Sequence, residues 1–311
     1  MSIVVIGSLN MDLVVNVEDF PKQGETVLAS DTLFVPGGKG ANQALAISLL
    51  GGQVSMIGRV GQDAFGRALK ENLQKNNVDV TYTYIDERRN SGLAFISVGK
   101  NGDNRIIVSP GANSLLSPED IEALEEVIAK AKGVVLQLEI PLATVERAVE
   151  IASKHNVKVF LDPAPAQVLS RSLLSKVDFI FPNENEAMEL TGVEIYDLET
   201  AKTAAAKLLE MGCQQVLLKL GAKGVLFARE NYYHHFPGFE VEVVDTTAAG
   251  DAFCAGFVLS YLEHQELAGA ITYANAAGAL TSTRLGAQSS LPTREEVLNL
   301  LDKCKKRVVL K

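Results

Sequence analysis

The sequence predicts an α/β protein with a central, mostly parallel β-sheet flanked by helices and a small second β-sheet that forms a lid. Short, continuously apolar runs recur along the chain, and helical patterns separate most of them. Two longer stretches, residues 12–36 and 92–110, break this alternation. Alternating strands and helices are typical of a parallel sheet covered by helices.

The expected strands of the central sheet are apolar runs without the polar alternation of a half-exposed strand. The first, residues 3–6, ends at Gly7. Continuous runs of this kind are typical of strands buried on both faces, as in parallel sheets. Comparable runs lie at residues 134–138, 157–161, 179–181 and 216–218.

Helical patterns between these runs favour βαβ units with right-handed crossovers. Ser117 before Pro118 has the composition of a helix start, and Thr293 and Glu296 have the spacing of a capping box. Gly212 is placed to end a helix. The expected helices span residues 42–50, 64–76, 118–130, 142–154 and 198–211.

Residues 12–36 and 92–110 have strand-like patterns and turns, with no helical pattern inside either stretch. They do not fit a parallel sheet, so we expect a small separate β-layer over one end of it, which could act as a lid. An antiparallel extension of the main sheet is the alternative. Residues 1–311 are expected to form one domain, a size that single α/β domains often reach.

Composition and charge narrow the function classes. The chain of 311 residues is 47% hydrophobic with a net charge of −9, which excludes global disorder and predicts no nucleic-acid partner. The N-terminus lacks a basic region and a long apolar stretch, so we expect neither a signal peptide nor a membrane partner. Cys213, Cys254 and Cys304 have no metal-binding or redox spacing, which favours thiols in a reducing cytoplasm.

The strongest chemical signal is the segment 245–251 (Asp-Thr-Thr-Ala-Ala-Gly-Asp), which a helical pattern follows over residues 252–262. Small residues at a helix start let a phosphate approach backbone N–H groups, and the helix dipole favours its charge. Asp251 in this first turn is placed to accept a hydroxyl proton during in-line phosphoryl transfer. An acid that only stabilises the helix start is the alternative interpretation.

A glycine-rich segment, residues 36–44 (Pro-Gly-Gly-Lys-Gly-Ala-Asn-Gln-Ala), places Lys39 and Asn42 at a helix start. Clustered glycines permit a ligand to approach the backbone closely. The segment lacks the spacing of a Walker A loop. A plain strand-to-helix turn is the alternative.

Residues 7–12 (Gly-Ser-Leu-Asn-Met-Asp) follow the first expected strand, where ligands gather in open α/β sheets. Asn10 and Asp12 offer an amide and a carboxylate, the groups that bind polyol hydroxyls. An Asx-rich turn is the alternative.

Residues 181–186 (Phe-Pro-Asn-Glu-Asn-Glu) follow a short strand and open a helix. Their acids and amides could position Mg²⁺ through water, because this ion keeps much of its hydration shell. Charge compensation at a helix start is the alternative.

Together and in this order, the four segments resemble the ribokinase-like (PfkB) family of carbohydrate kinases over essentially the whole chain. The matching motifs lie at residues 10–12, 38–42, 183–186 and 245–251. The resemblance implies that the chain is an ATP-dependent kinase that phosphorylates the primary hydroxyl of D-ribose, giving D-ribose 5-phosphate and ADP. A kinase for a related sugar such as deoxyribose, or a non-catalytic sugar or nucleotide sensor on the same fold, remains an alternative.

The resemblance also implies roles for single residues. Asp251 would be the catalytic base, and the backbone N–H groups of Ala248, Ala249 and Gly250 would form an anion hole facing the γ-phosphate. The sugar would be held by Asn10, Asp12, Gly38, Lys39, Asn42, Glu139 and Asp251. The nucleotide and its Mg²⁺ would contact Asn183, Glu186, Lys219, Gly221, Gly224, Gly250 and Asn275. At the position of Lys219 the family frequently has a threonine.

Two further features follow from the resemblance. One is a homodimer formed through the β-lids. The other is a monovalent cation, normally K⁺, that binds beside the anion hole as an activator. Its ligands, several of them backbone carbonyls, would come from Asp245, Thr247, Thr281, Arg284, Gly286 and Ser290.

Overall fold

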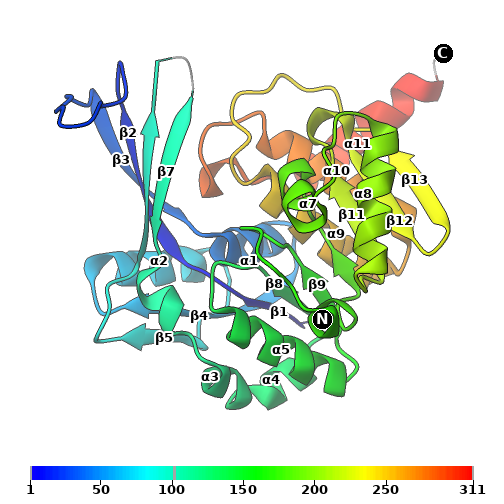
Figure 1. Cartoon of the computed structure of the whole chain (residues 1–311), viewed down its shortest axis with the longest axis horizontal. Helices are drawn as coiled ribbons and strands as arrows, with labels where there is room; N and C mark the ends of the chain where they lie inside the picture. Colours follow the sequence, from blue (N-terminus) through cyan, green and yellow to red (C-terminus); the bar gives the residue numbers. More distant parts are fainter. Residues whose placement is uncertain (1, 101–102, 310–311) are drawn as a thin grey trace.

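The computed structural model describes residues 2–100 and 103–309 and contains a nine-stranded and a four-stranded sheet (Figure 1). The larger sheet is parallel from β5 to β11, and β12 and β13 add an antiparallel edge. Its spatial order is β13 (Tyr232–Phe236), β12 (Val225–Arg229), β11 (Gln215–Lys219), β10 (Phe179–Ile180), β9 (Lys158–Leu161), β8 (Gly133–Leu136), β1 (Ser2–Ile6), β4 (Gln53–Gly61) and β5 (Thr83–Asp86). The predicted mostly parallel sheet is confirmed.

Helices cover both faces of this sheet, as the continuously apolar strands require. In β1, Ile3 and Val5 pack into one core and Val4 and Ile6 into the other. The first core is completed by α1 (Lys39–Leu49), α2 (Ala64–Lys75), α9 (Ala249–His264), α10 (Leu267–Thr281) and α11 (Arg294–Val309). The second is completed by α3 (Pro118–Glu122), α4 (Glu125–Ala129), α5 (Leu142–Lys154), α6 (Arg171–Leu174), α7 (Glu184–Thr191) and α8 (Leu198–Glu210). No helix in the described ranges is long and apolar enough to cross a membrane.

Several boundaries differ from the sequence prediction. The expected helix over residues 118–130 is two short helices, because Leu124 leaves the helical region at φ −109° and ψ 17°. Helices α1 and α9 each begin three residues earlier than predicted, at Lys39 and Ala249. Strands β4 and β5 and helix α10 were not predicted. The glycines and Arg59 of β4 interrupt its apolar run, and α10 carries no charged residue and lacks an amphipathic pattern.

The smaller sheet projects away from the main one (Figure 1) and has the order β3 (Asp31–Gly37), β2 (Asn10–Asn16), β6 (Gly92–Val98) and β7 (Asn104–Ser109). Two antiparallel hairpins join through the parallel pair β2 and β6. The predicted separate β-layer is confirmed, and the alternative of an edge extension is wrong. Movement of this sheet as a lid, and a single domain over residues 1–311 with lid segments 12–36 and 92–110, stay predictions.

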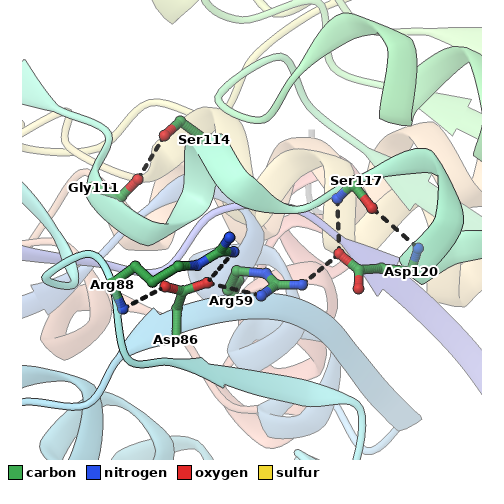
Figure 2. Close-up of polar contacts among 7 residues, drawn as sticks. All are labelled: Arg59, Asp86, Arg88, Gly111, Ser114, Ser117 and Asp120. Atoms are coloured by element: carbon green, nitrogen blue, oxygen red, sulfur yellow. Dashed lines mark hydrogen bonds and ion pairs between the residues drawn. The ribbon is translucent and has the colours of Figure 1, made fainter.

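Charged side chains join the ends of β4 and β5 to α3 (Figure 2). Arg59 on β4 contacts Asp86, where β5 ends, at 2.9 Å and Asp120 in α3 at 2.5 Å. Arg88 reaches the same oxygen of Asp86 at 3.1 Å. Hydrogen bonds from Arg88 first, and from Arg59, lower the pKa of Asp86 to about 2 although its side chain is buried. We call Arg59, Asp86, Arg88 and Asp120 the Arg59 cluster.

Candidate active site

The candidate site lies at the carboxyl ends of β1, β8, β9 and β11, where the N-termini of α1 and α9 meet them. Carboxyl ends of parallel strands open on the same edge of a sheet, which is the usual ligand edge of α/β folds. Residues far apart in the sequence therefore converge there.

Asp251, in the first turn of α9, is the most buried acid of the predicted sugar and base residues, with 5% exposure. Its Oδ2 accepts a hydrogen bond from Asn42 Nδ2 at 2.9 Å, and its Oδ1 accepts one from Gln43 Nε2 at 3.0 Å. Burial raises the pKa of Asp251 to about 6, against the opposing effect of Lys39 and the two amides. The carboxylate is therefore oriented and can exchange a proton near neutral pH.

A buried polar network extends from Asp251. Gln43 Nε2 also donates to Asp162 Oδ2 at 3.1 Å, and Lys219 Nζ donates to Asp162 Oδ1 at 2.9 Å. We call Asn42, Gln43, Asp162, Lys219 and Asp251 the Asp251 cluster. Sequence reasoning missed Gln43 and Asp162. Asp162 directly follows an expected strand, which is a usable signal, whereas Gln43 is distinguished by nothing except its place beside Asn42.

The N-terminus of α9 has the features expected of an anion hole. Among the described side chains none caps this helix, and its N-cap residue Ala248 is left-handed at φ 61°. The N–H of Ala249 donates to the Thr246 carbonyl at 3.2 Å, so this predicted donor is already engaged in a turn. A Cβ atom on Gly250 would stand 3.3 Å from Lys219 Nζ. Glycine there leaves room between the helix and the lysine.

The predicted sugar residues cluster at the end of β1. Asp12 is 9% exposed, and burial, followed by the charges of Glu139 and Asp251, raises its pKa to about 7. Glu139 Oε2 accepts the Lys39 backbone N–H at 3.1 Å and also the hydroxyl of Ser8. Burial lowers the pKa of Lys39. The negative charges of Asp251, Asp162 and Glu139 outweigh burial and raise this pKa above its ordinary value.

Backbone geometry explains Gly38 in this group. Its φ is +87°, and a Cβ atom there would lie 2.7 Å from the Asn10 backbone nitrogen. Only glycine adopts this conformation in the available space. The loop before α1 can therefore pass directly against the start of β2.

Sequence reasoning missed Asn113, which holds Asn10 in place. It lies in the short 3₁₀ helix η1 (Gly111–Leu115) and is 1% exposed. Its Oδ1 accepts the Leu9 N–H at 3.0 Å, and its Nδ2 donates to the Leu9 carbonyl at 3.1 Å and to Asn10 Oδ1 at 2.8 Å. An asparagine in a turn carries no sequence signal for such a role.

Asn183 and Glu186 form a capping box at the start of α7. Glu186 accepts from the Asn183 backbone N–H at 2.7 Å and from its Nδ2 at 2.8 Å. Burial raises the pKa of Glu186, and the charge of Lys219 opposes this shift. Lys219 also forms a β-bridge with Asn183. The structure thus brings Asn183, Glu186 and Lys219 together.

Three further residues predicted to bind the nucleotide, Gly221, Gly224 and Asn275, lie at or near a neighbouring cavity. Gly221 and Gly224 bound the turn of η2 (Gly221–Lys223), both with positive φ, and a Cβ atom on Gly224 would collide with the Phe236 carbonyl at 2.1 Å. Residues 236–240 line a cavity of about 720 Å³ together with Asn275, whose Nδ2 donates to the Pro237 carbonyl at 3.2 Å. Asn275 therefore lies in this cavity, outside the Asp251 cluster.

The segments predicted to bind a monovalent cation also meet. Asp245 Oδ1 accepts from Thr247 Oγ1 at 2.7 Å, and Asp245 Oδ2 accepts from the Gly286 N–H at 2.8 Å. Thr281 and Ser290 are fully buried, and their hydroxyls donate to backbone carbonyls. The side chain of the remaining residue, Arg284, instead pairs with Glu296. Across the described residues, no cluster of three or more His, Cys, Asp or Glu is arranged to hold a metal ion.

Comparisons with known proteins agree with this architecture. A family model described as pfkB family carbohydrate kinase matches residues 1–294. A ribokinase from Haemophilus influenzae is 44% identical over 301 residues, which cover 97% of this chain and 98% of that protein. A deoxyribokinase from Salmonella typhi is 39% identical over 297 residues, covering 95% and 97%. The structure of Arabidopsis thaliana ribokinase complexed with ribose and ATP has a TM-score of 0.90 at 34% identity, covering 96% of this chain and 98% of that one.

Proposed function

The chain belongs to the pfkB family of carbohydrate kinases, and from this premise we propose that it transfers the γ-phosphoryl group of ATP to the primary hydroxyl of D-ribose. The products are D-ribose 5-phosphate and ADP. One observation carries the proposal: Asp251 is buried at the start of α9, beside both the residues proposed for the sugar and the proposed anion hole. Because a pure binding protein has no need of such a base, we do not propose the sensor alternative.

Asp251 acts as the general base in this proposal. Its carboxylate accepts the proton of the primary hydroxyl while the hydroxyl oxygen attacks the γ-phosphorus. Amide donors Asn42 and Gln43 fix the orientation of the carboxylate without neutralising it. Since burial raises the pKa of Asp251 to about 6, kcat/KM should fall as the pH drops below this value.

The N-terminus of α9 binds the γ-phosphate in this proposal. No described side chain occupies its N-cap, and the helix dipole favours an anion there. Since the Ala249 N–H is engaged with Thr246, the donors in the present conformation are those of Ala248 and Gly250. Lys39, whose charge Asp251, Asp162 and Glu139 stabilise, adds positive potential on the sugar side.

Asn183 and Glu186 fit an Mg²⁺ ion that is held mainly through water and ATP phosphates. A carboxylate and an amide oxygen are suitable ligands for Mg²⁺, which keeps most of its hydration shell. The lack of a three-residue acidic or histidine cluster in the described parts suits this indirect mode. When bound, the ion supplies charge neutralisation at the terminal phosphates. Glu186 and Asn183, which are hydrogen-bonded to each other, would hold the ion through its water ligands.

The segments 245–247 and 281–290 fit a monovalent cation such as K⁺. The side chains and carbonyls of the proposed ligands Asp245, Thr247, Thr281, Gly286 and Ser290 offer oxygen atoms. The side chain of Arg284 pairs with Glu296, which leaves its carbonyl as a ligand. The backbone N–H groups of Val244 and Asp245 both donate to the Ser282 carbonyl and hold the two segments together next to α9. A cation bound here would stabilise the turn that forms the anion hole. The proposal predicts that K⁺ raises turnover.

The cavity beside Asn275 fits the base of the nucleotide. Its volume of about 720 Å³ lies in the range of small-molecule sites. The glycine turn at residues 221–224 packs against its wall and leads back to Lys219 and the phosphate region. A need for ATP favours the cytoplasm as the location, and the free thiols Cys213, Cys254 and Cys304 are consistent with it.

The decisive experiment measures ADP release with fixed Mg·ATP and a panel of pentoses and hexoses, including D-ribose and 2-deoxy-D-ribose, with and without K⁺. Fast release that requires D-ribose and increases with K⁺ is expected. Preference for deoxyribose would keep the mechanism and change the substrate. No release with any sugar would overturn the proposed activity.

We also propose that two copies associate through the four-stranded sheets. That sheet exposes large apolar side chains on both of its faces, and patches of this kind mark interaction sites. The pairing register places Phe34, Phe95 and Ile107 on one face and Leu33, Ile106 and Val108 on the other, each exposed by at least 43%. Analytical ultracentrifugation should give twice the monomer mass, and Ile107→Glu should return the monomer.

A further inference from the structure

Lys219 lies between two helix N-termini. Its Nζ is 3.3 Å from the position of a Cβ atom on Gly250, in the first turn of α9. Its backbone N–H donates to the Pro182 carbonyl at 2.8 Å, and it bridges to Asn183, the N-cap of α7. The ammonium therefore lies beside the proposed γ-phosphate position at the start of α9.

Asp162 holds this ammonium in place. The two side chains are 13% and 2% exposed, and the distance between Lys219 Nζ and Asp162 Oδ1 is 2.9 Å. Among the described residues, Asp162 alone accepts a hydrogen bond from the Lys219 ammonium. Two of the three N–H groups of this ammonium can therefore donate to a ligand. Burial would lower the pKa of Lys219, but Asp162 outweighs burial and keeps it above the ordinary value.

We propose that the ammonium of Lys219 binds the γ-phosphoryl group during its transfer, positioned by its ion pair with Asp162. This rests on the proposed kinase function. Phosphoryl transfer places charge on the non-bridging oxygens, and fixed donors at that place stabilise the transition state. Lys219 keeps its proton throughout. Asp251 takes the hydroxyl proton, and the new bond joins the sugar oxygen to the γ-phosphorus. The bond between the γ-phosphorus and the β–γ bridging oxygen breaks, and its electron pair remains on the oxygen of the departing ADP.

The ion pair also ties this cation to the base. Asp162 accepts from Lys219 through Oδ1 and from Gln43 through Oδ2, and Gln43 donates to Asp251. A single hydrogen-bonded chain thus sets the relative positions of the phosphate-binding cation and the proton acceptor. A threonine at position 219, frequent in the family, could not form this chain, because its hydroxyl is too short and uncharged.

The test is a double-mutant cycle with Lys219→Met, Asp162→Asn and the double variant. Lys219→Met alone leaves Asp162 charged, buried and unpaired, which destabilises the fold for reasons unrelated to catalysis. The double variant removes both charges and keeps an amide that can still contact Gln43. Its thermal stability should return towards that of the unmodified protein, while kcat/KM for ATP should stay about 100-fold or more below it. If the turnover of the double variant lay within about threefold of that of the unmodified protein, the proposal would be overturned, and the Lys219–Asp162 ion pair would have a structural role only.

A binding experiment identifies the phosphate that Lys219 contacts. An ATP analogue with an imido bridge between its β- and γ-phosphates and ADP are titrated into the unmodified protein and the double variant, with sugar bound. The double variant should lose about tenfold more affinity for the analogue than for ADP, because only the analogue carries a γ-phosphoryl group. Equal losses for the two nucleotides would contradict contact with that group.

Controls separate this inference from the proposed function. Lys207→Met removes an exposed charge on α8 and should leave turnover unchanged. Sugar affinity, measured without nucleotide, should stay within about twofold in the double variant, because Asn42 and Asp251 keep their contacts. If the unmodified protein releases no ADP with any sugar, the proposed function fails. If it does and the double variant matches it, only the role of Lys219 fails.

Discussion

The Arg59 cluster and the Asp251 cluster both bury a carboxylate, yet the two acids behave in opposite ways. Asp86 and Asp251 are 3% and 5% exposed. Arginines bind Asp86 and lower its pKa to about 2, whereas Asp251 has only amide donors in direct contact, and burial raises its pKa to about 6. Two acids of similarly low exposure thus serve as a charged structural anchor in one place and a proton acceptor in the other. Hydrogen bonds from arginine have the largest influence on the pKa of Asp86, whereas loss of hydration has the largest influence on that of Asp251.

Replacing the acid of the Asp251 cluster should give the largest effect on activity. Asp251→Asn keeps the size of the side chain and removes the proton acceptor, so kcat should fall about 10³-fold. Sugar binding should persist, because Asn10, Asp12 and Glu139 remain. The variant should also be more stable at pH 8, on the order of 1–3 kcal/mol, since a charge is no longer buried among amides. Steady-state kinetics and urea denaturation measure both quantities, and unchanged turnover would contradict the assignment of the base.

Replacing Arg59 should have the opposite effect to Asp251→Asn: it should lower the free energy of unfolding and leave turnover nearly unchanged. Arg59→Met leaves Asp120 without its arginine and Asp86 with Arg88 alone, which should cost about 2–3 kcal/mol of unfolding free energy. Turnover with saturating sugar should change by less than about twofold, because no member of this cluster contacts the Asp251 cluster. Arg88→Met is the matched control: this side chain is 74% exposed, so solvent screens its ion pair and its loss should reduce stability less than the loss of Arg59. Equal losses for the two variants would refute the importance of burial.

A smaller effect is expected at Asn113, which joins the lid root to the sugar site. Asn113→Ala leaves the backbone N–H and carbonyl of Leu9 without their partner and frees Asn10. KM for the sugar should rise about tenfold, while kcat and KM for ATP should change by less than about twofold. Ser114→Ala is the control, because this exposed hydroxyl contacts only the Gly111 carbonyl of its own turn. A fall in kcat without a change in KM would argue against a positioning role.

Local sequence pattern could predict the strands of the main sheet and several residues at its ligand edge. Strands of the main sheet were recognisable because burial on both faces requires continuous apolar runs, and the loop residues that follow them were recognisable because ligands gather at that edge. Asn42 and Asp251 were predicted on this basis together with the family motifs. The structure places them 2.9 Å apart although 209 positions separate them in the sequence.

Residues that act through partners distant in the sequence could not be predicted. Arg59 interrupts the apolar pattern of β4, so the strand was missed, and its two acids lie 27 and 61 positions away. Gln43 and Asn113 look like ordinary polar residues until Asp162 and Asn10 are brought beside them. Helix α10 was missed because it consists largely of small and apolar residues and has no charged face. Such features depend on tertiary neighbours rather than on local pattern.

The smallest effect that we predict is a difference in how the contributions of Asp251 and Asp86 to the free energy of unfolding depend on pH. An unfolded aspartate has a pKa of about 3.9. Folded Asp251 titrates at about 6, so between about pH 4 and 6 the folded state binds more protons, and this group's contribution to stability falls as the pH rises. Folded Asp86 titrates at about 2, so its contribution is complete above about pH 4 and is lost as the pH falls towards 2.

Difference curves cancel the contributions of all groups that do not interact with the replaced side chain. The stability of Asp251→Asn minus that of the unmodified protein should grow between about pH 4 and 6, by less than about 1.4 kcal/mol per pH unit, and then level off. The deficit of Arg59→Met should be constant above about pH 4 and shrink below it, because a protonated Asp86 no longer benefits from the arginine. Urea denaturation at half-unit pH intervals measures both curves. If both differences changed in the same pH window, the opposite pKa shifts of the two buried acids would be wrong, and with them the distinction between an anchoring and a proton-accepting cluster.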